Sequence, residues 1–123
     1  MLRGAVTVIA LALTGCNAIP AQVPVQRAAG IFVERGSGRT LYTYDRDDAP
    51  FAQQFCSGDC LKGWTPLAAP PGAKAGRGFS LIERNSEPLQ WAYRDRPLYL
   101  RDGEAAGERA GHGVANLWRI ARP

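Results

Sequence analysis

Short apolar runs separated by turn residues dominate the chain from residue 30 onward, a pattern that favours β-strands over helices. The stretch IFVERGSGRTLYTYD holds two such runs around Gly36-Ser37-Gly38, which predicts a hairpin. LQWAY and PLYL, joined by Arg94-Asp95-Arg96, predict a second hairpin, and GFSLIER and NLWRIA predict two further strands. One or two helical turns are predicted over residues 57–62. The expected fold is a mainly β, small single domain of antiparallel strands and hairpins.

The elements recur within the chain, which predicts two related halves. Leu41-Tyr42 is followed by acidic residues and later by Trp64, and Leu98-Tyr99 is followed by an acidic residue and later by Trp118. The separations of tyrosine and tryptophan are close enough for a duplicated unit with a small deletion. Each half is expected to bury its aromatic side chains against the other, with Leu41 and Leu98 both in the core.

The N-terminus has the pattern of an export signal. Residues 1–15 combine one basic residue with an apolar run too short to span a bilayer, and they end in LTG before Cys16. This resembles a bacterial lipobox, so residues 1–15 are expected to be a signal peptide and Cys16 a lipidation site. The alternatives are an ordinary signal peptide with a chance cysteine and a buried N-terminal strand. Residues 16–29 are expected to be the acylated cysteine and a flexible tether, and residues 30–123 the β-rich domain. Asn17 after the cysteine favours the outer membrane, facing the periplasm, if the host is Gram-negative.

Two cysteines remain, Cys56 and Cys60, in a compartment where disulfides form and persist. Their spacing on a helical turn brings the two Cα atoms within disulfide range. A disulfide that fixes one local turn is therefore expected. The alternative is a Cu(I) or thiol-redox site formed by Cys56, Cys60 and His112, because thiolates and imidazole suit Cu(I).

Four ordered motifs carry a resemblance to a known family. The motifs are YTYDRD, CSGDCLKGWTPL, QWAYRDRPLYL and GHGVANLW. The chain thus resembles a family of predicted bacterial lipoproteins with a Yx(F/W/Y)xxD motif, also called secreted repeats of unknown function. The second copy, YLRDGE, lacks both the second aromatic residue and the spaced aspartate. The residues that match the family motifs are Tyr42, Tyr44, Asp47, Trp64, Trp91, Tyr99 and Trp118.

Two groups of residues, the aspartates and the aromatic residues, allow either a structural or a ligand-binding role. Asp45, Asp47, Asp48 and Asp59 are favoured as solvated turn residues, with a Ca²⁺ site as the alternative. The tyrosines and tryptophans are favoured as core residues, with a ligand-binding aromatic face as the alternative.

Composition and motifs limit the function. A formal net charge of +4 with scattered arginines, on an exported chain, argues against nucleic-acid binding. No catalytic motif is present, so an enzyme is not expected. The sequence predicts a non-enzymatic interaction or structural module that is tethered to the membrane, without a cofactor and with an envelope protein as a potential partner. The alternative is the periplasmic copper or thiol-redox protein.

Overall fold

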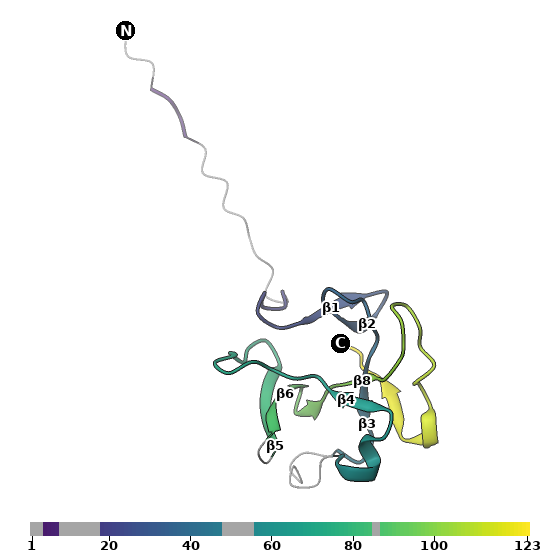
Figure 1. Cartoon of the computed structure of the whole chain (residues 1–123). Coiled ribbons are helices and arrows are strands. Elements are labelled where there is room, and N and C mark those ends of the chain that lie inside the picture. The colour runs from purple at the N-terminus through teal and green to yellow at the C-terminus, as the bar shows by residue number, and fades with distance from the viewer. Residues whose placement is uncertain (1–3, 8–17, 48–55, 85–86) are drawn as a thin grey trace.

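The computed structural model describes residues 4–7, 18–47, 56–84 and 87–123 and consists mainly of antiparallel strands (Figure 1). Two short 3₁₀ turns are the helical elements of this described part, and neither is long and apolar enough to cross a membrane. The mainly β fold class is confirmed. The elements are β1 (Val25–Ala28), β2 (Ile31–Glu34), β3 (Leu41–Tyr44), η2 (Gly58–Leu61), β4 (Trp64–Pro66), β5 (Phe79–Arg84), β6 (Glu87–Tyr93), β7 (Arg96–Pro97), β8 (Tyr99–Arg101), η3 (Val114–Asn116) and β9 (Trp118–Ile120).

A four-stranded antiparallel sheet in the order β4-β8-β3-β9 forms the centre of the molecule. Its middle pair aligns Leu41 with Leu100 and Tyr42 with Tyr99. The outer strands carry the tryptophans, with Trp64 opposite Arg101 and Trp118 opposite Tyr44. The predicted closing strand at NLWRIA is confirmed as β9.

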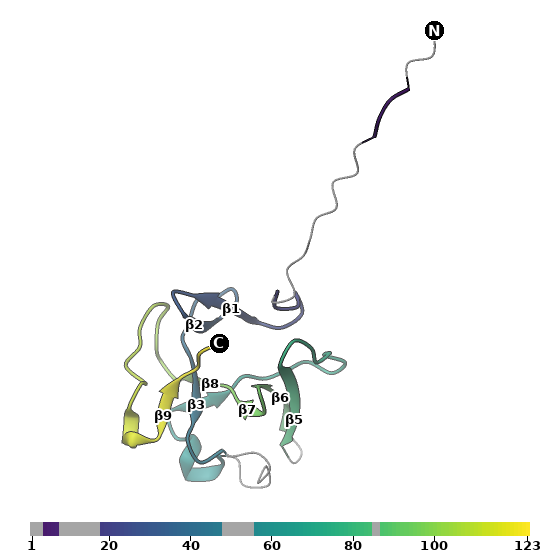
Figure 2. The ribbon, with the colours of Figure 1, turned by 180° about the vertical axis from the view of Figure 1, so that it is seen from behind.

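Two hairpins stand beside this sheet, as the view from behind shows (Figure 2). One is β1–β2, and the other is β5–β6, which continues into β7. Arg94 and Asp95, with φ of 47° and 65°, form the tight turn between β6 and β7, since two positive φ values match the twist of a two-residue hairpin. The predicted second hairpin is thereby confirmed. The predicted first hairpin is looser, because β2 meets the β3 segment through the single Val33–Thr40 bridge and takes β1 as its main partner.

The prediction of a flexible tether over residues 16–29 is wrong for residues 25–28. Residues 25–28 form β1, and Val23 and Val25 are fully buried. The alternation of these two valines around a proline is a strand pattern, and it lets both side chains join the apolar core next to Phe32 and Trp91. The ordered domain therefore begins before residue 30.

Matching backbone hydrogen bonds relate a first half, from β1 through β4 to Leu67, to a second half, from β5 through β9 to Ala121. The Leu67 N–H donates to the Leu98 carbonyl at 2.9 Å, and the Ala121 N–H donates to the Leu41 carbonyl at 2.8 Å. Leu41 and Leu98 are both fully buried, as predicted.

The β1–β2 and β5–β6 hairpins also make matching hydrogen bonds, each to the other half. The Phe32 N–H donates to the Ala121 carbonyl, and the Trp91 N–H donates to the Leu67 carbonyl, each at 2.9 Å. Each hairpin thus attaches to the segment that follows a tryptophan strand. The prediction of two related halves is confirmed by this correspondence of strands and bonds.

Candidate functional site

Four aromatic rings meet where the two halves join. Trp64 and Trp118 stack face to face, with ring centroids 3.7 Å apart and planes 6° from parallel. Tyr42 meets the edge of Trp64, and Tyr99 meets Trp118 edge-on, both at 5.1 Å. All four side chains are buried, so these motif residues form core and not an open aromatic face.

The hydroxyl of Tyr42 is bonded to a carboxylate of the other half. It donates to Oε1 of the buried Glu104 at 2.6 Å, and the Gly111 N–H donates to Oε2 at 3.2 Å. Burial, and next the bond to Glu104, raise the pKa of Tyr42 far above its ordinary value. This tyrosine therefore stays protonated and acts as a donor.

Tyr99 makes the reciprocal contact. Its hydroxyl donates to Oδ2 of the buried Asp47 at 2.5 Å, and the Cys56 N–H donates to Oδ1 at 2.7 Å. Burial first, and then the charge of Asp47, raise the pKa of Tyr99 far above its ordinary value. We call Tyr42–Glu104 and Tyr99–Asp47 the cross-half pairs, because each joins a tyrosine of one half to an acid of the other.

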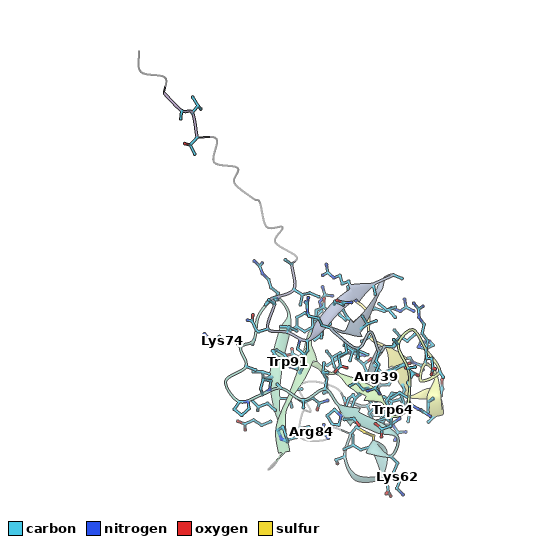
Figure 3. All side chains as sticks on the ribbon, turned by 45° about the horizontal axis from the view of Figure 1, so that its top comes forward. Arg39, Lys62, Trp64, Lys74, Arg84 and Trp91 are labelled. Atoms are coloured by element: carbon cyan, nitrogen blue, oxygen red, sulfur yellow. A yellow bond between two sulfur atoms is a disulfide. The ribbon has the colours of Figure 1, made fainter. Side chains whose placement is uncertain are left out.

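Arg84, the last residue of β5 and labelled in Figure 3, extends this network. The Arg84 guanidinium donates to the Cys56 carbonyl, to Gln90 at 2.8 Å and to the Tyr99 hydroxyl at 3.4 Å. The buried polar groups of the centre are thus hydrogen-bonded to one another, which is the condition for burying them without a large cost.

The cross-half pairs explain how the second motif copy departs from the first. Glu104 follows Tyr99 at the spacing at which Asp47 follows Tyr42, so glutamate takes the place of the aspartate. Arg101 takes the place of the second aromatic residue: its guanidinium lies 5.0 Å from the ring centroid of Trp64. In the first half the corresponding contact is that of Tyr44 with Trp118, at 4.7 Å. The identical spacing was the signal that sequence reasoning missed.

The turn aspartates do not gather at one site in the described part of the chain. The prediction that Asp47 is solvated is wrong, because it is buried as a partner of Tyr99. Asp45 accepts from Arg119 Nε at 3.2 Å, and Asp59 pairs with Lys62 Nζ at 3.3 Å on the surface. Asp48 lies outside the described residues.

Cys56 and Cys60 form a disulfide across η2, with their Cα atoms 5.4 Å apart. The disulfide prediction is confirmed, and the predicted helical turn is confirmed as η2. Cys56 is buried in the cluster that contains Trp64, and its backbone N–H donates a hydrogen bond to Asp47. The disulfide therefore fixes the turn that leads into β4.

His112 is exposed in the loop before η3, and its Nδ1 accepts the Ile120 N–H at 3.1 Å. Both sulfurs of the predicted copper set, Cys56 and Cys60, are bonded to each other. Within the described ranges, no three His, Cys, Asp or Glu side chains group as a metal site would require.

Trp91 belongs to a second, more apolar cluster, between the β5–β6 hairpin and the β1–β2 hairpin. It is fully buried, and its Nε1 finds no hydrogen-bond partner in the part of the chain that the structure describes. Its role as a motif residue is thus to fill the core, like that of Trp64 and Trp118.

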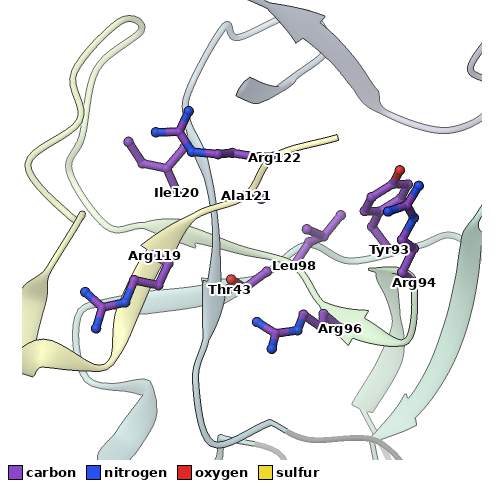
Figure 4. Close-up of a pocket in the computed structure, with 9 residues that line it drawn as sticks. All are labelled: Thr43, Tyr93, Arg94, Arg96, Leu98, Arg119, Ile120, Ala121 and Arg122. Carbon is purple, nitrogen blue, oxygen red and sulfur yellow. The ribbon is translucent and has the colours of Figure 1, made fainter. Parts of the chain in front are cut away.

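A basic hollow on the surface was not expected from the sequence (Figure 4). It encloses about 280 Å³ between β3, β9 and the turn from β6 to β7. We call it the arginine pocket, because four of its nine lining residues are arginines. In the sequence these arginines belong to the RDR turn and to the basic C-terminal residues. Because the two stretches are far apart in the chain, their sequence pattern did not indicate a shared pocket. The lining residues are Thr43, Tyr93, Arg94, Arg96, Leu98, Arg119, Ile120, Ala121 and Arg122.

Cys16, the predicted lipidation site, lies outside the described residues. No curated protein and no solved structure matches this chain. The resemblance inferred from the motifs is nevertheless confirmed for one half, and the description of the matching family as secreted indicates an exported chain. The family model that matches, over residues 23–68, is that of a secreted repeat of unknown function.

Proposed function

We propose that the protein is a lipid-anchored, non-enzymatic interaction module of the bacterial cell envelope. The observation that carries this proposal is the internal use of its chemically versatile groups. Tyr42 and Tyr99 donate to buried carboxylates, and Cys56 and Cys60 are joined to each other. The motif residues thus maintain a rigid scaffold, and recognition falls to the surface.

Anchoring is proposed to occur through acylation of Cys16, which ends the lipobox-like LTGC. More than one acyl chain is needed for durable membrane attachment, and lipoprotein processing supplies them at one cysteine. If the host is Gram-negative, Asn17 favours the outer membrane, with the domain facing the periplasm. Residues 17–22 would then separate the lipid from the buried Val23 and from β1, which follows it.

The Cys16→Ser variant tests the anchor. It should remain a longer precursor, incorporate no labelled palmitate and leave the detergent phase, because the acylated thiol is absent. The matched control replaces Cys56 and Cys60 with serine, which removes the other two cysteines and should leave processing and membrane fractionation intact. A Cys16→Ser protein that is still cleaved and still fractionates with membranes would refute the anchor.

The second candidate function is thiol-redox or Cu(I) binding at Cys56, Cys60 and His112. The observation that favours this candidate is the disulfide itself, because it shows that the two sulfurs lie close enough to act together. Thiols are titrated on the isolated protein with and without reductant, and Cu(I) is then added. A structural disulfide predicts no free thiol before reduction. Free thiols as isolated, with 1:1 Cu(I) binding that His112→Ala abolishes, would favour the second candidate.

A further inference from the structure

The arginine pocket brings together four arginines from two stretches of the chain, residues 94–96 and residues 119–122. Arg94 lies in the turn between β6 and β7, Arg96 begins β7, Arg119 lies on β9, and Arg122 follows that strand (Figure 4). No aspartate or glutamate lines the pocket. Asp95 lies on the turn between two of the arginines but is not among the lining residues.

The arginines differ in how far their charges are already neutralised. Arg119 donates to Asp45 and to Asn116, and Arg94 lies over the ring of Tyr93. Arg96 and Arg122 are exposed, and in the described residues neither side chain has a hydrogen bond or an ion pair. A guanidinium stays charged at any physiological pH, so these two groups leave the pocket with uncompensated positive charge.

The geometry points to a phosphate group as the ligand, and we propose that the arginine pocket binds one. A guanidinium offers a planar fork of donors that matches phosphate and carboxylate oxygens. A planar carboxylate has two oxygens and suits one fork, whereas a phosphate presents oxygens in several directions and carries more charge. Arginines that line one pocket from two stretches of the chain therefore fit a phosphate better. Leu98, Ile120 and Ala121, which are buried, add apolar atoms to the lining.

The phosphate can come from two sources, a small soluble phosphate or the headgroup of a phospholipid. This inference deepens the proposed interaction function and rests on it for the compartment in which the ligand is met. The two proposals can fail separately: a protein that is anchored through Cys16 but binds no phosphate would refute the phosphate site alone.

Titration of the detergent-solubilised full chain with pyrophosphate, followed by calorimetry or by NMR shifts, tests the proposal. Saturable binding is expected, weakening as salt rises, because exposed charges are screened. Replacing Arg96 and Arg122 together with glutamine should weaken binding at least tenfold. The matched control replaces Arg27 and Arg109, two exposed arginines outside the pocket, and should change it less than twofold.

Co-sedimentation with vesicles identifies the source, and it uses the Cys16→Ser protein and its Arg96/Arg122 variant, because an acyl anchor would bind every vesicle. Phosphatidate vesicles are compared with vesicles of phosphatidylserine, which adds a carboxylate, and of phosphatidylcholine alone, in the presence and absence of pyrophosphate. Binding that prefers phosphatidate and that the Arg96/Arg122 variant loses assigns a lipid headgroup; binding of pyrophosphate without that preference assigns a soluble phosphate. An equal loss of pyrophosphate binding in the Arg96/Arg122 and Arg27/Arg109 variants would overturn the proposal. Equal binding of pyrophosphate and of the dicarboxylate succinate would overturn it too, because either result indicates general charge attraction. Absence of any phosphate binding would overturn it as well.

Discussion

The hydroxyl of Tyr42 is the smallest group whose removal tests the cross-half pairs. In a Tyr42→Phe variant the ring still packs against Trp64, but Oε1 of Glu104 loses its donor at 2.6 Å. Glu104 is 7% exposed, so water replaces that donor poorly, and the Gly111 N–H remains on the other oxygen. A hydrogen bond to a charged acceptor contributes about 1.5–3 kcal/mol, so the free energy of unfolding should fall by about 2 kcal/mol.

Chemical denaturation followed by tryptophan fluorescence measures this loss, since Trp64 lies in the same cluster. For a domain of this size the melting temperature should fall by about 10 °C. Tyr44→Phe is the matched control, because its ring packs on Trp118 and its hydroxyl has no hydrogen-bond partner among the described residues. That variant should lose less than about 0.5 kcal/mol.

A double-mutant cycle with Glu104→Gln isolates the pair from the rest of the core. The two changes should be non-additive by about 1–2 kcal/mol, because each removes the same charged contact. Equal losses in Tyr42→Phe and Tyr44→Phe, or strict additivity in the cycle, would refute the idea that this contact joins the halves.

Three further predictions concern the same centre. Replacing Cys56 and Cys60 with serine should cost about 2 kcal/mol and leave the β circular dichroism intact, because the closed loop is short; a loss of the β spectrum would contradict this. Above about pH 10 the free energy of unfolding should fall, because the buried tyrosines of the cross-half pairs keep their protons when folded and release them when unfolded; phenylalanine at both positions should remove that part of the fall, and an unchanged alkaline unfolding curve would contradict it. Gly111→Ala should destabilise by about 1–3 kcal/mol in thermal melts, since a Cβ would lie 2.9 Å from Trp64, whereas Gly76→Ala, with its nearest neighbour at 3.6 Å, should be nearly neutral; equal melts would show that the core adapts.

Local patterns in the sequence were sufficient for most of the strands and for the duplication. The second hairpin follows from two apolar runs that flank a short turn, and such a turn fixes its own register. The disulfide follows from spacing and compartment, because two cysteines on one turn have few other partners. The two halves follow from the Tyr42–Trp64 and Tyr99–Trp118 recurrences, since the same side chains at similar spacing fill equivalent places.

The sequence did not predict what depends on contacts between distant segments. Asp47 has the local pattern of a turn residue, and its burial follows from a tyrosine contributed by the other half. The first strand was missed because Pro24 and the polar residues of β1 hide the alternation of Val23 and Val25. The arginine pocket assembles residues from β6, β9 and the segment after β9, so no single stretch of sequence carries its pattern.

The strand order has a consequence for what one repeat can do. In the sheet β4-β8-β3-β9, each of the three pairings joins a strand of one half to a strand of the other. The cross-half pairs follow the same rule, so each half keeps a buried tyrosine and a buried acid whose partners lie in the other half. A half on its own would leave both groups unpaired and the sheet unformed, at a cost of several kcal/mol. The family model spans one repeat, residues 23–68, but the unit that satisfies its own hydrogen bonds is two repeats, which this chain supplies in tandem.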